Sequence, residues 1–360
     1  MKQSSEVKRQ KISPFKKYDF LTILAIFAGF VVAMIIMQAA MGMEMKFITP
    51  GNWLNILMQV TVVGVIAMGM TIVMISGGID LSVGSLVTLT AIFTALAVTK
   101  WAIPVPLAIL FAILLAVGFE LLLGFIISRL EVEPFIITLG GMILFKGIAL
   151  LLCESREVVM QGQLDFFKTN LIEGAKGTDG LNLTIPIYVV IMIAVTIITW
   201  WVLKYTKYGR RIYATGANPS AARLAGINVA NIKLSSYAIN GLLVGIGAVI
   251  ALARINVGNS TIGQNLEIDV IAAAVIGGVA MSGGKGNAIG TLIGAILLGA
   301  ITNGMNILRL PSEWQFVAKG AIIIAAVSAG AISAKMAAKA NLKKQKTIAE
   351  AEIEAGNAAK

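Results

Sequence analysis

The feature that most constrains this chain is a series of ten apolar runs, five of them free of charged residues and five with a single one. They lie at residues 20–41, 55–76, 84–99, 103–128, 134–152, 185–203, 234–254, 268–281, 288–308 and 315–333. Most are close to the roughly 20 residues that a helix needs to cross a bilayer. With 58% hydrophobic and 13% charged residues, the chain has more apolar surface than a water-soluble core of this size could bury. It is therefore predicted to be an all-α polytopic membrane protein with about ten transmembrane helices.

Two of the runs, 84–99 and 268–281, are short for a complete crossing and lie beside glycine-rich stretches. Non-helical backbone at membrane depth is tolerated only inside protein or beside a water-filled cavity, so we expect short or broken helices there. The stretch 77–82 also resembles the stretch 277–282, with Gly77-Gly78 matching Gly277-Gly278. Weak internal symmetry of this kind occurs in repeat-built transporters. Chance agreement in a chain rich in Gly, Ala and Val remains an alternative.

The positive residues are distributed unequally between the two predicted sides of the membrane. With ten crossings and the N-terminus inside, 20 of the 29 Lys and Arg residues lie in cytoplasmic segments and 7 in external ones. The positive-inside rule then places both termini in the cytoplasm of a bacterial inner membrane. The net charge of +11 is concentrated in short loops and tails, so we expect contacts with membrane lipid and none with nucleic acid.

The predicted organisation has three parts: a basic cytoplasmic N-terminus over 1–19, a transmembrane domain over 20–333, and a charged cytoplasmic tail over 334–360. Within the domain, loop 153–184 is predicted to be external and the strongly basic loop 204–233 to be cytoplasmic. The run 20–41 is too long for the core of a signal peptide, so it is interpreted as the first retained helix.

The chain lacks the parts of an enzyme. It has no histidine and one cysteine, Cys153, which excludes Cys/His metal sites, Ser-His-Asp triads and internal disulfides. The stretch Gly283-Gly284-Lys285-Gly286 has the look of a phosphate loop, but Gly286 stands where Ser or Thr is required, and Val279 where Gly is. We therefore expect no metal, no bound cofactor and no nucleotide site.

Several polar residues lie within or beside the apolar runs. Gly77, Gly78, Asp80 and Ser82 form either a surface turn that caps the next helix or a broken helix on a pathway. Glu120 has no nearby helix end and should face the protein interior or a cavity. For Lys146 and Lys319, which lie nearer helix ends, we expect extension to the lipid headgroups.

Loop 204–233 contains signals for a short capped helix. Asn218-Pro219 is a turn signal, Ser220 is the expected N-cap, and the helix over Ala221–Ala225 should end at Gly226. Such a helix has little apolar surface for lipid and suits docking against another protein, although an ordinary basic loop remains the alternative. On the other side, Glu267 and Asp269 stand at the predicted outer mouth, where they either meet a soluble partner or favour a helix dipole.

Together these motifs resemble the permease subunits of ribose-type ABC importers, the type-2 binding-protein-dependent permease family. The resemblance covers about residues 50–330 and is carried by the stretches 77–85, 134–140, 208–228 and 267–284. It implies a type II-like importer permease that pairs with a second copy of itself, two cytoplasmic ABC ATPase domains and an external sugar-binding protein. ATP would be used by the partner subunits alone.

The resemblance also implies roles for particular residues. The coupling helix that docks on the ATPase would comprise Ser220, Ala221, Ala222, Arg223 and Gly226, with Ser220 replacing the family's leading acid. The positions at helix breaks or on the pathway would be Gly77, Gly78, Asp80, Ser82, Glu120, Gly277 and Gly278. The external protein would dock near Glu267 and Asp269. The implied function is alternating-access import of a monosaccharide such as ribose, galactose or xylose. The alternatives are a nucleoside or another small polar solute, or ion-driven secondary transport.

Overall fold

The computed structural model describes residues 15–176, 182–325 and 328 of the chain. The chain forms two compact units, Met1–Pro311 and Ser312–Lys360. The described part of the second unit is a helix over 312–325. The predicted tail 334–360 and most of the predicted N-terminal segment, residues 1–14, lie outside the described residues.

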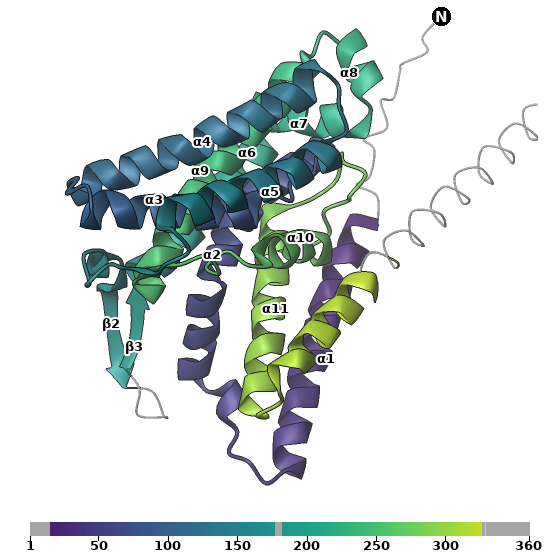
Figure 1. The fold of residues 1–360 in the computed structure, drawn as a ribbon. Helices are drawn as coiled ribbons and strands as arrows, with labels where there is room; N and C mark the ends of the chain where they lie inside the picture. Colours follow the sequence, from purple (N-terminus) through teal and green to yellow (C-terminus); the bar gives the residue numbers. More distant parts are fainter. Residues whose placement is uncertain (1–14, 177–181, 326–327, 329–360) are drawn as a thin grey trace, which may run out of the picture. The chain divides into compact units, whose positions relative to one another are not determined.

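The first unit is built from helices (Figure 1). These are α1 (Phe15–Ala40), α2 (Pro50–Ile75), α3 (Val83–Thr99), α4 (Val105–Arg129), α5 (Pro134–Cys153), α6 (Ile187–Tyr205), α7 (Lys207–Ala217), α8 (Pro219–Leu224), α9 (Val229–Ile255), α10 (Leu266–Ile276) and α11 (Ala288–Ile307). Two 3-10 helices lie at Lys46–Ile48 and Asp165–Lys168. The expected all-α polytopic fold is confirmed.

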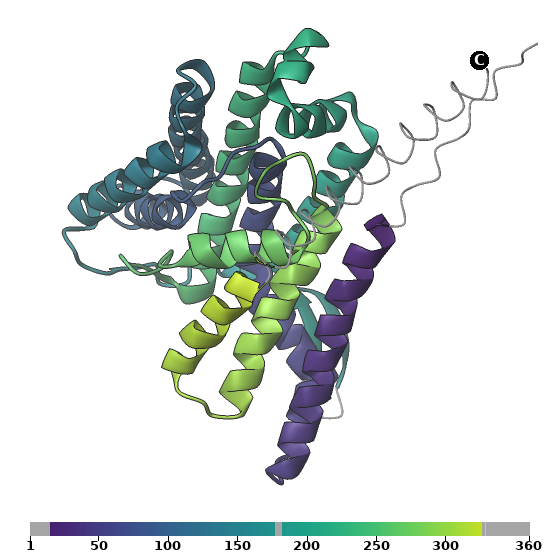
Figure 2. The same ribbon diagram turned by 90° about the vertical axis from the view of Figure 1, so that its right-hand side faces the viewer.

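The strands are few and short. β1 (Val158–Val159) pairs antiparallel with β4 (Val257–Gly258), and β2 (Asn170–Lys176) pairs antiparallel with β3 (Asn182–Pro186). Three of the four belong to the predicted external loop 153–184. In both views of the unit, β2 and β3 lie away from the end that carries α7 and α8 (Figures 1 and 2).

Each of the ten apolar runs contains a helix, but the helices differ in length. Among the described residues, six helices are long and apolar enough to cross a membrane: α2, α4, α5, α6, α9 and α11. α10 has 11 residues, so at about 1.5 Å per residue it spans roughly half of a 30 Å hydrocarbon layer. The run 268–281 is thus a half-length helix followed by non-helical backbone. The number of crossings stays a prediction.

Local sequence signals set several helix starts. Pro50, Pro134 and Pro219 each occupy the first turn of their helices, where an N–H has no partner within the helix. Thr49 caps α2 by accepting a hydrogen bond from the backbone N–H of Asn52 at 3.3 Å. The start of α2 is therefore set by residues adjacent in sequence.

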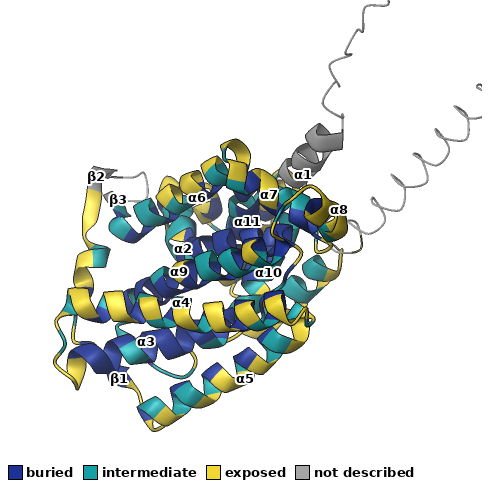
Figure 3. Cartoon of the chain, turned by 90° about the horizontal axis from the view of Figure 1, so that it is seen from above, coloured by how far each residue is buried: buried dark blue, intermediate teal, exposed yellow. Residues whose placement is uncertain are grey.

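The core of the first unit is formed by α2, α3 and α9. Their residues are largely buried, whereas α4, α5 and α6 keep apolar side chains exposed on their outer faces (Figure 3). A water-soluble protein would not expose such surfaces, and lipid or another apolar protein face suits them. α3 is too short for a long span but is enclosed by its neighbours along almost its whole length.

Glycines allow α9 to pack closely against α4. A methyl group at Gly241 would lie 2.8 Å from the carbonyl oxygen of Ala116, and one at Gly245 would lie 2.9 Å from the Cα of Ile113. The spacing of four residues puts both glycines on one face of α9. Small residues at this spacing let helix backbones approach in a membrane, where dispersion contacts replace the hydrophobic effect.

We predict that Gly241→Ala destabilises the protein by about 1–3 kcal/mol, because the backbone of α4 cannot move away locally. Gly118→Ala on α4 is the matched control, since a methyl group there meets no atom within 4 Å. It should leave stability unchanged or raise it by up to about 1 kcal/mol. Thermal unfolding of the purified full-length variants in one detergent measures both, and equal melting temperatures would contradict the close packing.

Candidate functional site

The link between α2 and α3 is a polar segment enclosed in the apolar interior. Asp80 and Ser82 are completely buried. Oδ1 of Asp80 accepts hydrogen bonds from the backbone N–H of Ser82 at 2.8 Å and from its hydroxyl at 2.7 Å. From α9, Asn240 donates its Nδ2 to Oδ2 of Asp80 at 2.7 Å, and the Tyr237 hydroxyl donates to the carbonyl of Ile79 at 3.0 Å. These bonds satisfy the non-helical backbone that a membrane protein tolerates only inside protein.

The alternative of a surface turn at this position is wrong. Asp80 is shielded by α9, and Ser82 precedes α3 without donating or accepting a side-chain cap bond. Glu120 on α4 is also fully buried and lies beside Asp80 and Asn240. A pathway role for these residues stays a prediction.

Sequence reasoning missed Asn240 and Tyr237. A signal for Asn240 was present, because a polar amide in the middle of the apolar run 234–254 is costly unless it has a partner. Tyr237 carried no comparable signal, since a tyrosine suits either an interface with lipid headgroups or an interior.

The second break follows α10 and has the same local geometry as the first. Gly77 after α2 and Gly278 after α10 adopt left-handed conformations, with φ of 86° and 87°. In both places the N–H of this glycine and the N–H of the following residue donate to carbonyls in the last turn of the helix, which is the Schellman pattern. In backbone geometry Gly77 therefore corresponds to Gly278. The sequence similarity pairs Gly77 with Gly277 instead, so the two alignments differ by one residue. Gly277 is the C-cap residue of α10, with a negative φ of −68°, and a methyl group there would overlap the backbone of α11.

Three turns meet at one end of α2. The backbone N–H of Gly284 donates to the carbonyl of Ile75 at 2.9 Å, and a methyl group at Gly216 would overlap the same carbonyl. A methyl group at Gly283 would lie 2.9 Å from Cα of Gly77. The Tyr213 hydroxyl donates to the carbonyl of Gly286 at 2.8 Å. The end of α7 is thus in direct contact with both breaks.

The phenols of α7 are well placed to stay neutral. Burial raises the pKa of Tyr213, and it also raises the pKa of Tyr208, whose hydroxyl is 2.7 Å from the Ser235 hydroxyl of α9. Both rings therefore act as hydrogen-bonding supports that tie loop 204–233 to the helices beneath it.

The short helix predicted in this loop is present, but its cap is different. Asn218 is the N-cap, since its side chain accepts from the N–H of Ala221 at 3.0 Å, and the expectation that Ser220 caps the helix is wrong. The helix runs over Pro219–Leu224 because Asn218 starts it two residues earlier. Gly226 follows with φ of 77°, a conformation that favours glycine. Ala222 is buried, whereas Leu224 is 91% exposed.

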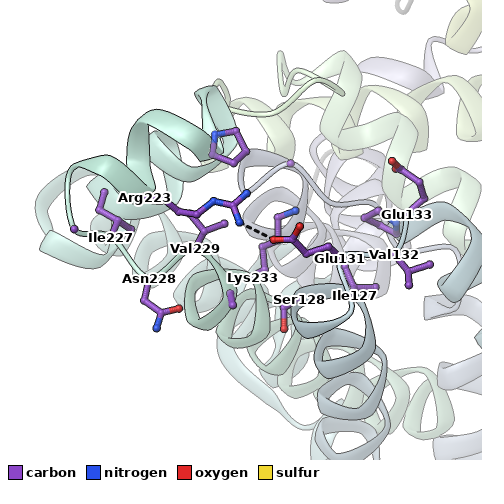
Figure 4. A pocket seen from close by; sticks show the side chains of 15 residues that line it. Ile127, Ser128, Glu131, Val132, Glu133, Arg223, Ile227, Asn228, Val229 and Lys233 are labelled. Atoms are coloured by element: carbon purple, nitrogen blue, oxygen red, sulfur yellow. Dashed lines mark hydrogen bonds and ion pairs between the residues drawn. The ribbon is translucent and has the colours of Figure 1, made fainter.

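A cleft of about 560 Å³ lies beside this helix, between the α4–α5 turn and the start of α9 (Figure 4). Across it, the Arg223 guanidinium binds the Glu131 carboxylate at 2.6 Å, and Figure 4 shows the two side chains pointing toward each other. The hydrogen bond from Arg223, together with its charge, lowers the pKa of Glu131. Exposed pairs of this kind add little to stability, so the bond serves to position α8 against the α4–α5 turn. Sequence reasoning had singled out Arg223 but not Glu131.

The predicted outer mouth is more enclosed than expected. Glu267 and Asp269 lie in the first turn of α10 and are half-buried. Oε2 of Glu267 lies so close to Gly84, at the start of α3, that a methyl group there would overlap it. Lys146 donates to the backbone carbonyl of Ser260 rather than extending to headgroups, so it links α5 to the loop before α10. Docking of an external protein here stays a prediction.

The described residues contain no group of three or more His, Cys, Asp or Glu side chains that could hold a metal ion. They present instead two helix breaks, of which the first is enclosed in the apolar helix array and the second is partly exposed. The end of α7 contacts both breaks, and the capped helix α8 follows it directly. This arrangement defines a polytopic helical membrane protein with non-helical segments between its helices.

Comparison with known proteins then gives the family. The family model described as "branched-chain amino acid transport system / permease component" matches residues 52–327. The chain belongs to this permease family, which confirms the resemblance seen in its motifs.

Named relatives are similar over most of their length. The chain is 38% identical to the ribose import permease of Haemophilus influenzae over 83% of this chain and 91% of the relative. It is 39% identical to the ribose import permease of Escherichia coli K12 over 78% and 86%. It is 32% identical to the xylose transport system permease of Haemophilus influenzae over 82% and 93%. No solved structure matches the chain.

We predict that Asn240→Leu destabilises the protein by about 1.5–3 kcal/mol, because the Asp80 carboxylate loses a buried partner. Asn55→Leu on α2 is the matched control. Asn55 is exposed and accepts a bond only from the Gln59 side chain, so its replacement should change stability little. Thermal unfolding of both variants decides the matter, and an unchanged melting temperature for Asn240→Leu would show that α9 does not hold the break.

Proposed function

We propose that this chain is the membrane permease subunit of an ABC importer that carries a monosaccharide of the ribose or xylose class into the cell. The observation that carries the proposal is the identity of 38% to a ribose import permease over 91% of that protein's length. The family model matches residues 52–327, a range that includes loop 204–233 and both helix breaks. Galactose, nucleosides and other small polar solutes are the alternatives that competition for uptake would separate.

The geometry around α7 and α8 suggests how a partner would drive transport. Leu224 is held out into solvent by a helix that does not need it for its own packing, so it is the best candidate for contact with an ATPase subunit. A push on α8 reaches Gly216 at the end of α7, which touches Ile75 at the end of α2 and Gly284 in the loop after α10. Movement of the partner would thereby displace both breaks together and open the path alternately to each side.

The energy source in this proposal is ATP hydrolysis in separate subunits, and this chain is not an enzyme. The glycine-rich loop 282–287 supports that view, because its N–H at Gly284 and its carbonyl at Gly286 are already bonded to Ile75 and Tyr213. An N–H that is already bonded is not free to bind a phosphate oxygen, which supports the proposal that this loop holds no nucleotide.

We propose a docking surface on this chain for each partner that completes the importer. Two ATPase domains would dock at α8, including Ser220, Ala221, Ala222, Arg223 and Gly226. A second permease copy suits the exposed apolar faces of α4 and α5, and an external sugar-binding protein would meet the Glu267 and Asp269 region. ATP is the only cofactor implied, and it is bound by the partners.

The function is tested by uptake into proteoliposomes that contain the permease, its ATPase and its binding protein. Radiolabelled ribose or xylose should accumulate only with ATP. Uptake that continues without ATP hydrolysis, or that stops when an uncoupler is added at constant ATP, would favour ion-driven transport instead.

Leu224→Arg tests the coupling assignment within that assay. Because Leu224 packs against nothing in the unit, we expect an unchanged melting temperature, at least a tenfold loss of uptake and loss of ATPase co-purification (a factor of ten is about 1.4 kcal/mol). Leu171→Arg in β2 is the control, since it is also exposed but belongs to the predicted external loop. Equal uptake and co-purification in both variants would contradict docking at α8.

Both termini and loop 204–233 are proposed to be cytoplasmic, and α7–α8 and β2–β3 to be on opposite sides. The chain has one cysteine, Cys153, which is buried and is removed by Cys153→Ala. In that background a single introduced cysteine is the only thiol, so its labelling shows on which side of the membrane it lies. A membrane-impermeant maleimide should label Gln161→Cys in intact cells and Ser220→Cys only after the membrane is opened. The reverse pattern would invert the orientation.

A further inference from the structure

One acid in the buried polar cluster has no hydrogen-bond partner. Glu120 of α4 is fully buried, and neither of its carboxyl oxygens is bonded to another group. Its neighbours are the side chains of Asp80, Asn240 and Ser82. Oδ1 of Asn240 is buried and unpartnered as well. Buried acceptors without a donor are rare in native proteins, and each one calls for a physical explanation.

The donors in this cluster are already directed at Asp80. Ser82 gives both its backbone N–H and its hydroxyl hydrogen to Oδ1, and Asn240 gives an amide hydrogen to Oδ2. Asp80 thus accepts three hydrogen bonds, which suits a carboxylate that can only accept. Glu120 lies beside this carboxylate and close to the same two donors, but neither of its oxygens has a hydrogen-bond partner.

Basic side chains on the surrounding helices do not compensate the two acids, because they are engaged elsewhere. Arg129 of α4 binds the Asn231 side chain, Lys146 of α5 binds the Ser260 carbonyl, and Arg254 of α9 binds the Gln59 carbonyl. Lys233 of α9 lines the cleft beside α8.

The titratable groups near Glu120 are Asp80 and the phenol of Tyr237, whose hydroxyl donates to the carbonyl of Ile79. α2 and α3 contain no charged residue. Two adjacent negative charges in such a place would repel each other with little screening, and neither would be solvated.

We propose that Glu120 holds a proton in the folded permease, so that Asp80, Glu120 and Asn240 form a buried site for one proton. A protonated Glu120 is neutral and becomes a donor to an acceptor oxygen of Asp80 or Asn240. The acid pair then carries one negative charge instead of two. The proton holds together three parts of the chain, namely α4, the α2–α3 break and α9, whichever solute the permease carries.

The site gives the fold a defined dependence on pH. At a pH high enough to remove this proton, the acid pair would carry two negative charges with no basic partner among the described residues, so stability falls there as pH rises. Loss of the proton in the folded state would push α4 away from the break. Since α9 begins at Val229, directly after the loop that carries α8, such a change would also reach the coupling end.

Infrared spectroscopy of the full-length protein tests the proton directly. The wild type should show a carbonyl band of a protonated carboxylic acid near neutral pH, and Glu120→Gln should lack it. Glu133→Gln is the matched control, because Glu133 is an exposed acid in the α4–α5 turn and its loss should leave the band in place. If Glu120→Gln does not fold, the wild type labelled with ¹³C-carboxyl glutamate decides, since only a glutamic acid band shifts with that label.

A second measurement follows melting temperature between about pH 6 and pH 9. The wild type and Glu133→Gln should lose stability with rising pH, and Glu120→Gln should lose clearly less. Absence of a protonated glutamic acid band would overturn the proposal. A band that persists in Glu120→Gln would also overturn it, as would stabilisation by sodium or potassium chloride with no such band, which would identify a cation site instead.

Discussion

The structure depends on one requirement, that backbone leaving a helix inside an apolar protein needs hydrogen-bond partners for its polar groups. At the α2–α3 link, side chains bond the N–H of Ser82 and the carbonyl of Ile79. Asp80 orders the link by accepting two bonds from Ser82, and α9 completes it through Asn240 and Tyr237. Water cannot substitute for these partners at membrane depth. The position of α9 is therefore set by the polar break as much as by apolar contact.

Glycine supplies the second part of the design. Gly241 and Gly245 bring α9 against α4, which places Glu120 beside the Asp80 cluster. Gly216, Gly283 and Gly284 bring the ends of α2 and α7 and the loop after α10 into backbone contact. Contacts between backbones leave little slack, which supports the proposal that a displacement at α7 would be passed on to both breaks. A permease moved by an external motor requires such a connection between its docking helix and its breaks.

Where local rules decide, sequence reasoning succeeded. Apolar runs located the long helices but not α7, which lies in the basic loop 204–233. Gly226 was recognised as the residue after the short helix α8 because a left-handed position favours glycine. It failed where two local signals competed. Asn218 and Ser220 are both able to cap a helix, and α8 begins at Pro219 with Asn218 as its cap. It failed also for partners distant in the chain. Nothing near Asp80 in sequence indicates Asn240, which lies 160 residues away, and nothing near Arg223 indicates Glu131.

The sequence by itself determined that this is an all-α membrane protein, where its helices lie, and which permease family it resembles, because these follow from hydropathy, charge distribution and short motifs. Tertiary structure alone decided that Asp80 is enclosed rather than exposed, that the two breaks correspond one residue out of register, and that α7 contacts both. It also decided that Glu120 meets a second acid without a basic partner among the described residues. The physical reason is the same in each case. Burial and hydrogen bonding inside a membrane are settled by which helices pack together, and that is not encoded within any single run.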